Sequence, residues 1–107
     1  MIYIDGIEYN KSDNDYIRTA IENHMNNMEV TVSTSGTTGH PKTVYHSADS
    51  IKKISDFNTE YFQLNTNSRI FSLFTPRSIA FTTVALYPSL NAGCDLFFET
   101  RIHKYID

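Results

Sequence analysis

Hydrophobic and polar positions change period several times along the chain, and each change predicts a new element. Residues 2–10 alternate around Asp5-Gly6, a turn dipeptide, which predicts a short N-terminal β-hairpin. From Ser12 the apolar residues recur at helical spacing, and Ser12 with Asp15 resembles a capping box. We therefore expect an amphipathic helix that ends near Asn27, with these apolar positions: Ile17, Ala20, Ile21, His24, Met25 and Met28.

The middle of the chain predicts two strands and a second helix. Residues 29–33 alternate as a strand, and residues 43–46 are again β-branched and aromatic, so strands flank the segment between them. Ser47 is the expected N-cap of the next helix, and a turn at residues 65–68 ends this unit. The helix has one apolar side, formed by Ile51, Ile54, Phe57, Tyr61 and Phe62.

A third unit completes the pattern. Residues 69–74 predict a strand, residues 75–78 a loop, and residues 79–91 a helix in which Pro88 should break or kink the last turn. Gly93 is typical of the position after a helix, and residues 94–99 predict another strand. This alternation indicates a single α/β domain over residues 1–107, with a partial, mainly parallel sheet and flanking helices.

Composition narrows the classes of function. Hydrophobic residues make up 40% of the 107 residues and charged residues 20%, which is typical of a globular domain. The net charge of −3, without a basic cluster longer than Lys52-Lys53, argues against a nucleic-acid partner. No apolar run has the length of a signal peptide or a membrane span, so we expect a cytoplasmic protein without a membrane partner.

Two residue types with metal or redox chemistry have simpler structural interpretations. Cys94 stands alone, which excludes an internal disulfide, and beside Gly93 it reads as a small buried hydrophobe. His24 lies on an apolar helix face without other metal-ligand types nearby, so we expect a packed, hydrogen-bonded histidine and assign it no role.

The segment from Thr34 to Lys42, TSGTTGHPK, carries the candidate chemistry. Gly36 and Gly39 allow the backbone N–H groups to approach an anion without a Cβ in the way. Ser35, Thr37 and Thr38 add hydroxyl donors, and Lys42 supplies a charge for phosphate oxygens. These residues together predict a phosphate-binding loop.

Two other interpretations of the loop are less favoured. A Walker A loop needs glycine directly before its lysine, and Pro41, which lacks an N–H, occupies that place. A plain solvated loop between strands is common for such a composition, but the order of small, hydroxyl and basic residues here favours phosphate binding.

The loop resembles the signature of the adenylate-forming (AMP-binding) superfamily, which includes acyl-CoA synthetases and peptide-synthetase adenylation domains. The order of elements from about residue 30 to residue 99 is similar to part of the large N-terminal domain of these AMP-dependent synthetases and ligases. The resemblance implies that Thr34, Ser35, Gly36, Thr37, Thr38, Gly39 and Lys42 bind the phosphates of ATP, with Mg²⁺ as co-ligand. It further implies an acid-activating ligase that joins a carboxylic acid to ATP and releases pyrophosphate.

Three departures from the family pattern limit these expectations. Thr43 replaces the small residue that usually follows the loop lysine. The stretch from Pro76 to Phe81 has no histidine, so an acyl-pocket role for Phe81 is disfavoured against a place in the core. The family's adenine, ribose, magnesium and C-terminal lysine motifs would all lie beyond Asp107.

We therefore interpret the chain as a truncated phosphate-loop fragment or one part of a split enzyme, inactive alone and completed by a partner chain. The alternative is a non-catalytic nucleotide-binding or protein-interaction module derived from such an enzyme. A sheet that continues past Glu99 in the parent fold would leave an unpaired edge, so we expect self-association, in the form of a homodimer through that edge.

Overall fold

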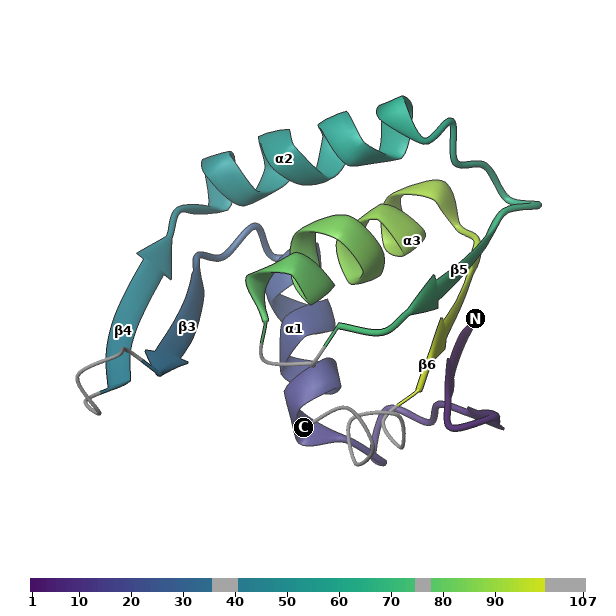
Figure 1. Cartoon of the computed structure of the whole chain (residues 1–107), viewed down its shortest axis with the longest axis horizontal. Helices are drawn as coiled ribbons and strands as arrows, with labels where there is room; N and C mark the ends of the chain where they lie inside the picture. The colour runs from purple at the N-terminus through teal and green to yellow at the C-terminus, as the bar shows by residue number, and fades with distance from the viewer. Residues whose placement is uncertain (36–40, 75–77, 100–107) are drawn as a thin grey trace.

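A computed structural model describes residues 1–35, 41–74 and 78–99 and shows an α/β fold (Figure 1). A four-stranded sheet has the order β2-β1-β6-β5, formed by β1 (Ile2–Ile4), β2 (Ile7–Glu8), β5 (Arg69–Ser72) and β6 (Asp95–Phe98). Strand β6 is parallel to both β1 and β5, and within this described sheet only the β1–β2 pair is antiparallel. The predicted fold class, with its mainly parallel sheet and N-terminal hairpin, is confirmed.

The N-terminal hairpin is built by its turn. Asp5 and Gly6 both have positive φ, 52° and 81°, as a tight turn between twisted strands requires. The hairpin also joins the first residues of the described chain to the last, because Tyr3 pairs with Phe97 across β1 and β6. Sequence pattern alone does not reveal this long-range pairing.

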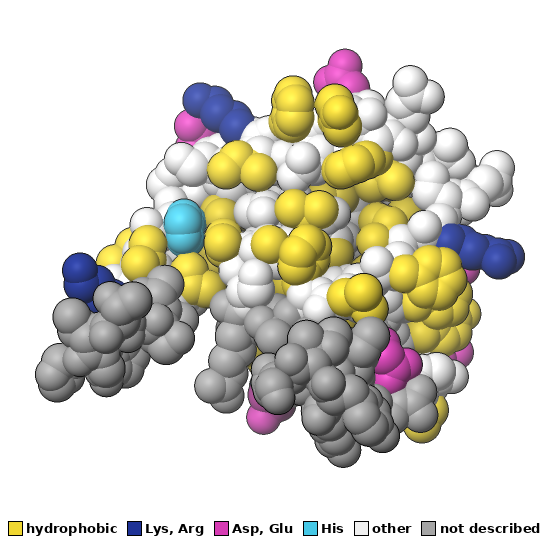
Figure 2. Space-filling view, in the orientation of Figure 1, with side chains coloured by type: hydrophobic (Ala, Val, Ile, Leu, Met, Phe, Trp, Pro, Cys, Tyr) yellow, Lys and Arg dark blue, Asp and Glu magenta, His cyan; other side chains and the backbone are white. Residues whose placement is uncertain are grey.

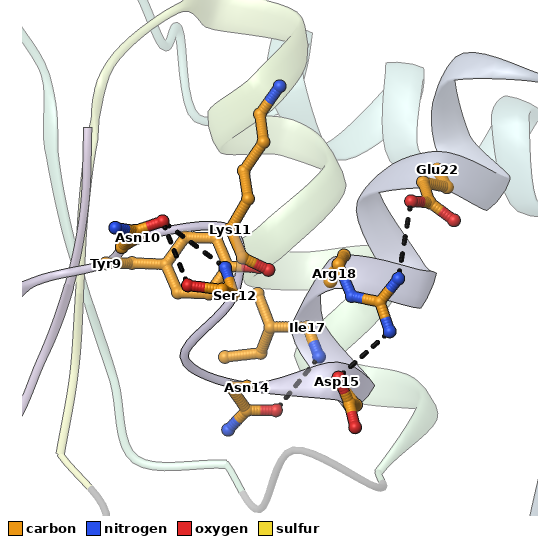
Figure 3. Close-up of polar contacts among 9 residues, drawn as sticks. All are labelled: Tyr9, Asn10, Lys11, Ser12, Asn14, Asp15, Ile17, Arg18 and Glu22. Atoms are coloured by element: carbon orange, nitrogen blue, oxygen red, sulfur yellow. Dashed lines mark hydrogen bonds and ion pairs between the residues drawn. The ribbon is translucent and has the colours of Figure 1, made fainter.

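Helix α1 (Asp15–Met25) begins one residue after its cap, and that cap is Asn14. The Asn14 side chain accepts from the Ile17 N–H at 3.1 Å, whereas the Ser12 N–H and hydroxyl both lie 3.3 Å from Asn10 Oδ1 in the preceding loop (Figure 3). The predicted capping box at Ser12 is therefore wrong. Asn14 satisfies a free helix N–H from a closer position, which leaves Ser12 to shape the loop.

Strands β3 (Val30–Ser35) and β4 (Pro41–His46) form a separate antiparallel pair that is not hydrogen-bonded to the larger sheet. This hairpin extends away from the remaining elements and leads directly into α2 (Ala48–Tyr61) (Figure 1). Ser47 is the N-cap of α2, as predicted, and accepts from the Ser50 N–H at 3.2 Å.

The last helix combines a π-helical segment, η1 (Phe81–Leu86), with α3 (Tyr87–Ala92). The helix does not break at Pro88, because it runs on to Ala92, and the departure from regular α-helix is the π-helical segment that precedes the proline. Pro88 lacks an N–H, and in a regular α-helix its ring would clash with the carbonyl four residues earlier. The wider π-helical turn of η1, just before Pro88, moves away from that regular geometry. The Tyr87 N–H binds the Thr82 carbonyl, and the Thr83 carbonyl instead accepts from Asn58 Nδ2 of α2 at 2.8 Å.

The core lies between the sheet and the helices. Phe81, Leu86, Leu96 and Phe98 are almost fully buried at its centre, and α2 packs on η1 and α3 from outside. Only Ile51 and Ser55 of α2 are buried, so much of the predicted apolar side of this helix faces outward. Its exposed members are Ile54, Phe57, Tyr61 and Phe62.

Strand β6 has neighbours on both sides, so the open edges of the described sheet belong to β5 and β2. The sequence predicts an unpaired sheet edge near Glu99, but β6, the strand that ends there, is paired on both sides. Dimerisation through a sheet edge stays a prediction. Among the described residues, no helix combines the length and apolar character that a membrane crossing needs.

Candidate functional site

The candidate phosphate loop closes the β3–β4 hairpin. The two strands pair over six positions, from Val30 opposite His46 to Thr34 opposite Lys42 and Ser35 opposite Pro41. The two ends of the TSGTTGHPK segment are therefore held side by side by an antiparallel ladder. This confirms that strands flank the loop, and it shows in addition that these strands pair with each other.

The described part of the chain includes some of the predicted phosphate-binding residues and leaves out others. Thr34 and Ser35 are the last two residues of β3. Lys42 is the second residue of β4, and it is exposed. The segment from Gly36 to His40, which contains Thr37, Thr38 and Gly39, lies outside the described residues. The assignment of these residues to phosphate binding thus stays a prediction.

The hairpin is attached to the domain through β3. Val30 and Val32 are 8% and 7% exposed, and Val30 belongs to the main core cluster. On β4, Tyr45 is 68% exposed, so the partner strand is covered much less. The ladder can hold the two ends of the loop in register. The attachment to the core, at Val30, lies at the end of β3 farthest from the loop.

A groove of about 440 Å³ lies beside the base of this hairpin, between α1 and β3. Its walls include Asp15, Tyr16, Glu29, Thr31 and Tyr87. The Tyr87 hydroxyl donates to the Ala20 carbonyl at 3.1 Å, and burial, together with the nearby Tyr16, raises the pKa of Tyr87 to about 12. Tyr87 is therefore a neutral hydrogen-bond donor that ties α3 to α1, with no capacity to act as a base near neutral pH.

A polar cluster that the sequence did not predict joins the three helices. Asn91 Oδ1 lies 2.9 Å from His24 Nε2, and Asn91 Nδ2 donates to Asp56 Oδ1 at 3.2 Å. Lys52 pairs with the same Asp56 side chain at 2.7 Å, and the His24 ring meets Tyr87 edge-on at 4.5 Å between centroids. These residues border a cavity of about 130 Å³. Asn91 and its partners are 35 and 67 residues apart, so no local pattern could have found them.

The predictions that three residues serve packing rather than chemistry are confirmed. His24 is packed and hydrogen-bonded, as expected. Cys94 is buried, and burial raises the pKa of its thiol, which disfavours a reactive thiolate. Phe81 is fully buried against Phe98, with ring centroids 5.0 Å apart, so it is a core residue, as expected.

The described residues show no preformed metal site. Within residues 1–35, 41–74 and 78–99, no three His, Cys, Asp or Glu side chains gather closely enough to hold a metal ion.

Comparison with known proteins finds one partial relative. The chain is 34% identical over 70 residues to a D-alanine--D-alanyl carrier protein ligase of Bacillus licheniformis, a ligase of the adenylate-forming class. The matched region covers 65% of this chain and 14% of the relative, so the chain spans about one seventh of that ligase. No family model and no solved structure matches the chain. The chain thus has a distant, partial similarity to an adenylate-forming ligase.

Proposed function

We propose that this chain contributes the phosphate-binding loop of an adenylate-forming ligase and acts as one part of an enzyme that further polypeptide completes. The observation that carries the proposal is the TSGTTGHPK segment at the closed end of a two-stranded ladder, where Lys42 pairs with Thr34. The partial similarity to the D-alanine--D-alanyl carrier protein ligase supports the same class.

The donor set of the loop fits the phosphates of ATP. Hydroxyls of Thr34, Ser35, Thr37 and Thr38 and the N–H groups at Gly36 and Gly39 would donate to phosphate oxygens. The Lys42 ammonium would offset the negative charge that grows on the leaving pyrophosphate. Bound Mg·ATP would supply the phosphoanhydride, which a carboxylate opens at the α-phosphorus to form an acyl-adenylate and pyrophosphate.

Residues that choose the acid lie elsewhere in this proposal. The name of the relative gives D-alanine as the acid and a carrier protein as the acceptor. The loop recognises only phosphate, which every adenylating ligase shares, and Phe81, at the start of η1, is buried in the core. The class of substrate is therefore a carboxylic acid, and its identity depends on segments that complete the enzyme.

The second candidate function is a non-catalytic nucleotide-binding or protein-interaction module. The observation that favours it is the large exposed apolar surface, which includes Phe57 and Tyr61 on α2 and Phe71 on β5. A protein-interaction module needs no charge at Lys42, so the loop separates it from the proposed ligase, whereas a nucleotide-binding module differs from the ligase only in lacking catalysis.

Isothermal titration calorimetry with pyrophosphate and with Mg·ATP tests the proposal. We expect saturable binding of both ligands to the wild-type chain and a loss of about tenfold or more in affinity for Lys42→Met, since one charged contact to phosphate is removed. Lys11→Met, a change at an exposed lysine far from the loop in sequence, is the matched control and should bind as the wild type does. Absence of binding to the folded wild-type chain would favour the interaction module.

A further inference from the structure

The groove between α1 and β3 is lined by polar side chains, and it lies outside the proposed phosphate loop. Asp15, Thr19 and Asn23 line it from one side of α1, where successive members are four residues apart. Glu29, directly before β3, and Thr31 within it line the other wall. The described residues that line this groove of about 440 Å³ include two carboxylates and neither lysine, arginine nor histidine. The groove is therefore negatively charged.

The two carboxylates lie toward different ends of the groove. Asp15 is the first residue of α1, and Asn23 follows it by eight residues, about 12 Å along the helix axis. The chain turns back at this second end, where the Met28 N–H donates to the Asn23 carbonyl at 2.9 Å, and Glu29 comes next. Strand β3 then runs back past α1 toward the loop (Figure 1). Negative charge is thus spread along the groove rather than gathered at one point.

Only part of this charge is offset within the described chain. Arg18 donates to Asp15 Oδ1 at 2.9 Å, which partly offsets the charge of Asp15 (Figure 3). Glu29 is exposed, and in residues 1–35, 41–74 and 78–99 no cation pairs with it. In Figure 2 the lysine and arginine side chains that this view shows lie at the rim of the molecule, and none is seen where Figure 1 places α1. The groove therefore suits a positively charged ligand and disfavours a phosphate.

Thr82 of η1 brings an unpartnered hydroxyl to the groove. The residue is 2% exposed and lines the groove. No described residue hydrogen-bonds to its side chain, whereas the hydroxyl of the neighbouring Thr83 donates to the Ile79 carbonyl at 3.0 Å. A buried hydroxyl without a partner is unfavourable, and most such groups in proteins are hydrogen-bonded. A ligand that donates an N–H to the Thr82 oxygen would satisfy it.

We propose that the groove binds a linear polyamine. Its terminal ammonium groups pair with Asp15 and Glu29, and an amine N–H between them donates to the Thr82 hydroxyl. The Tyr16 ring, which also lines the groove, offers an aromatic surface to a cationic chain.

Two other cations fit the groove less well. A metal ion needs several oxygen ligands around one point, whereas Asp15 and Glu29 lie apart, and the described residues bring no three His, Cys, Asp or Glu side chains together. A lysine-rich peptide shares the alkylammonium chemistry, but the volume of the groove is that of a small-molecule site. Both comparisons favour a free polyamine.

Isothermal titration calorimetry of the full chain with spermidine, at about 50 mM salt so that charge pairs are not fully screened, tests the proposal. We expect saturable binding to the wild type, a dissociation constant at least about tenfold higher for Glu29→Gln, and one about threefold or more higher for Thr82→Val. Glu60→Gln, at an exposed position of α2, is the matched control for the loss of one carboxylate and should bind as the wild type does. Lys42→Met should also bind spermidine normally, which separates this site from the phosphate loop.

Circular dichroism of each variant checks the fold. Thr82→Val should fold, because the hydroxyl that it removes has no partner in the described chain. A wild-type chain that binds no spermidine, an equal loss of affinity in Glu29→Gln and Glu60→Gln, or an unchanged affinity in Thr82→Val would each overturn the proposal. Tighter binding of an acetylated and amidated trilysine peptide, which has the same charge as spermidine, would overturn it in favour of a protein partner.

Discussion

Tyr87 shows how a single residue serves both packing and hydrogen bonding. Its side chain is 3% exposed, its ring contacts His24, and its hydroxyl donates to the Ala20 carbonyl of α1. A phenol in this place can stay neutral at little cost, whereas the phenolate would lose hydration and face a carbonyl oxygen. The residue therefore stabilises the fold only while it holds its proton.

We predict that Tyr87 makes stability fall at high pH. Its pKa is about 12 in the folded chain against 10.0 as the ordinary value. The unfolded chain thus loses the proton first, so the tyrosine's contribution is complete below pH 10 and is lost as the pH rises toward 12. Urea denaturation at about pH 9 and about pH 11 measures this.

The fall in unfolding free energy between these two pH values should be smaller in Tyr87→Phe than in the wild type. Tyr45→Phe is the matched control, because Tyr45 is 68% exposed and its removal should leave the wild-type fall intact. An equal fall in Tyr87→Phe and the wild type would contradict this account of Tyr87.

Single residues also mark where reading the sequence fails. Serine and asparagine are both favoured at the N-cap, so residue type alone does not decide between Ser12 and Asn14. The cap is Asn14, because the helix begins at Asp15. The predictions for His24 and Phe81 are confirmed, because each lies among apolar positions of a predicted helix, which indicates a side chain packed against the core. The partner of His24, Asn91, depends on tertiary structure and leaves no local signal.

At the scale of elements, the helix from η1 to α3 is the clearest case of a local conflict solved by a distant group. Pro88 removes one helix donor, the π-helical turn leaves the Thr83 carbonyl without a helix donor, and Asn58 of α2 supplies the missing bond at 2.8 Å. Thr83 is 6% exposed, so water is a poor substitute. The sequence predicts that Pro88 disturbs the helix, but the compensating donor, Asn58, lies 25 residues before Thr83 in the chain.

A double-mutant cycle tests this pairing of Pro88 and Asn58. Asn58→Ala should cost about 1 to 3 kcal/mol in the wild type, since a buried carbonyl loses its donor. In the Pro88→Ala background the same change should cost much less, because the restored N–H lets the helix itself satisfy Thr83. Thermal unfolding followed by circular dichroism gives both values, with the exposed Glu60→Ala as control on α2. Equal costs in the two backgrounds would refute the pairing.

The β3–β4 hairpin raises a different issue at this scale. Two strands alone are marginal in water, and this pair is attached mainly through Val30 and Val32. Alternating residues predicted both strands, but their mutual pairing and their separation from the main sheet are long-range facts. The phosphate-loop motif was readable because it is a contiguous run of residues with a mechanism.

We predict a clear gradient of amide protection between the two sheets. Amides of β6 that bond to β1 or β5 should exchange with solvent much more slowly than those of β4, because β6 has neighbours on both sides and two buried side chains. Hydrogen exchange followed by NMR measures both strands in one sample. Equal protection of β4 and β6 would show that the hairpin opens only with the whole domain.

At the scale of the whole molecule, α/β class and element order follow from the sequence, because alternating strand and helix patterns restrict the topology. The strand order does not follow, since β1 inserts beside β6 from the other end of the chain. The described domain has one covered sheet face and one open face.

We predict that the purified chain alone does not catalyse acid-dependent exchange of pyrophosphate into ATP. A phosphate loop offers few contacts, and these must offset the entropy of ordering both loop and ligand. Radiolabelled pyrophosphate with a panel of amino acids and fatty acids is the measurement, with Lys42→Met as control. Exchange that requires one acid and disappears in Lys42→Met would prove the prediction wrong.

The most direct test of the central claim is an NMR titration of the isotope-labelled chain with pyrophosphate and, separately, with Mg·ATP. The account predicts saturable shifts of the backbone amides of Gly36, Gly39 and Lys42 with each ligand, while amides of β6 stay in place. A well-dispersed spectrum in which none of these three amides moves with either ligand would contradict a phosphate-binding role for the loop.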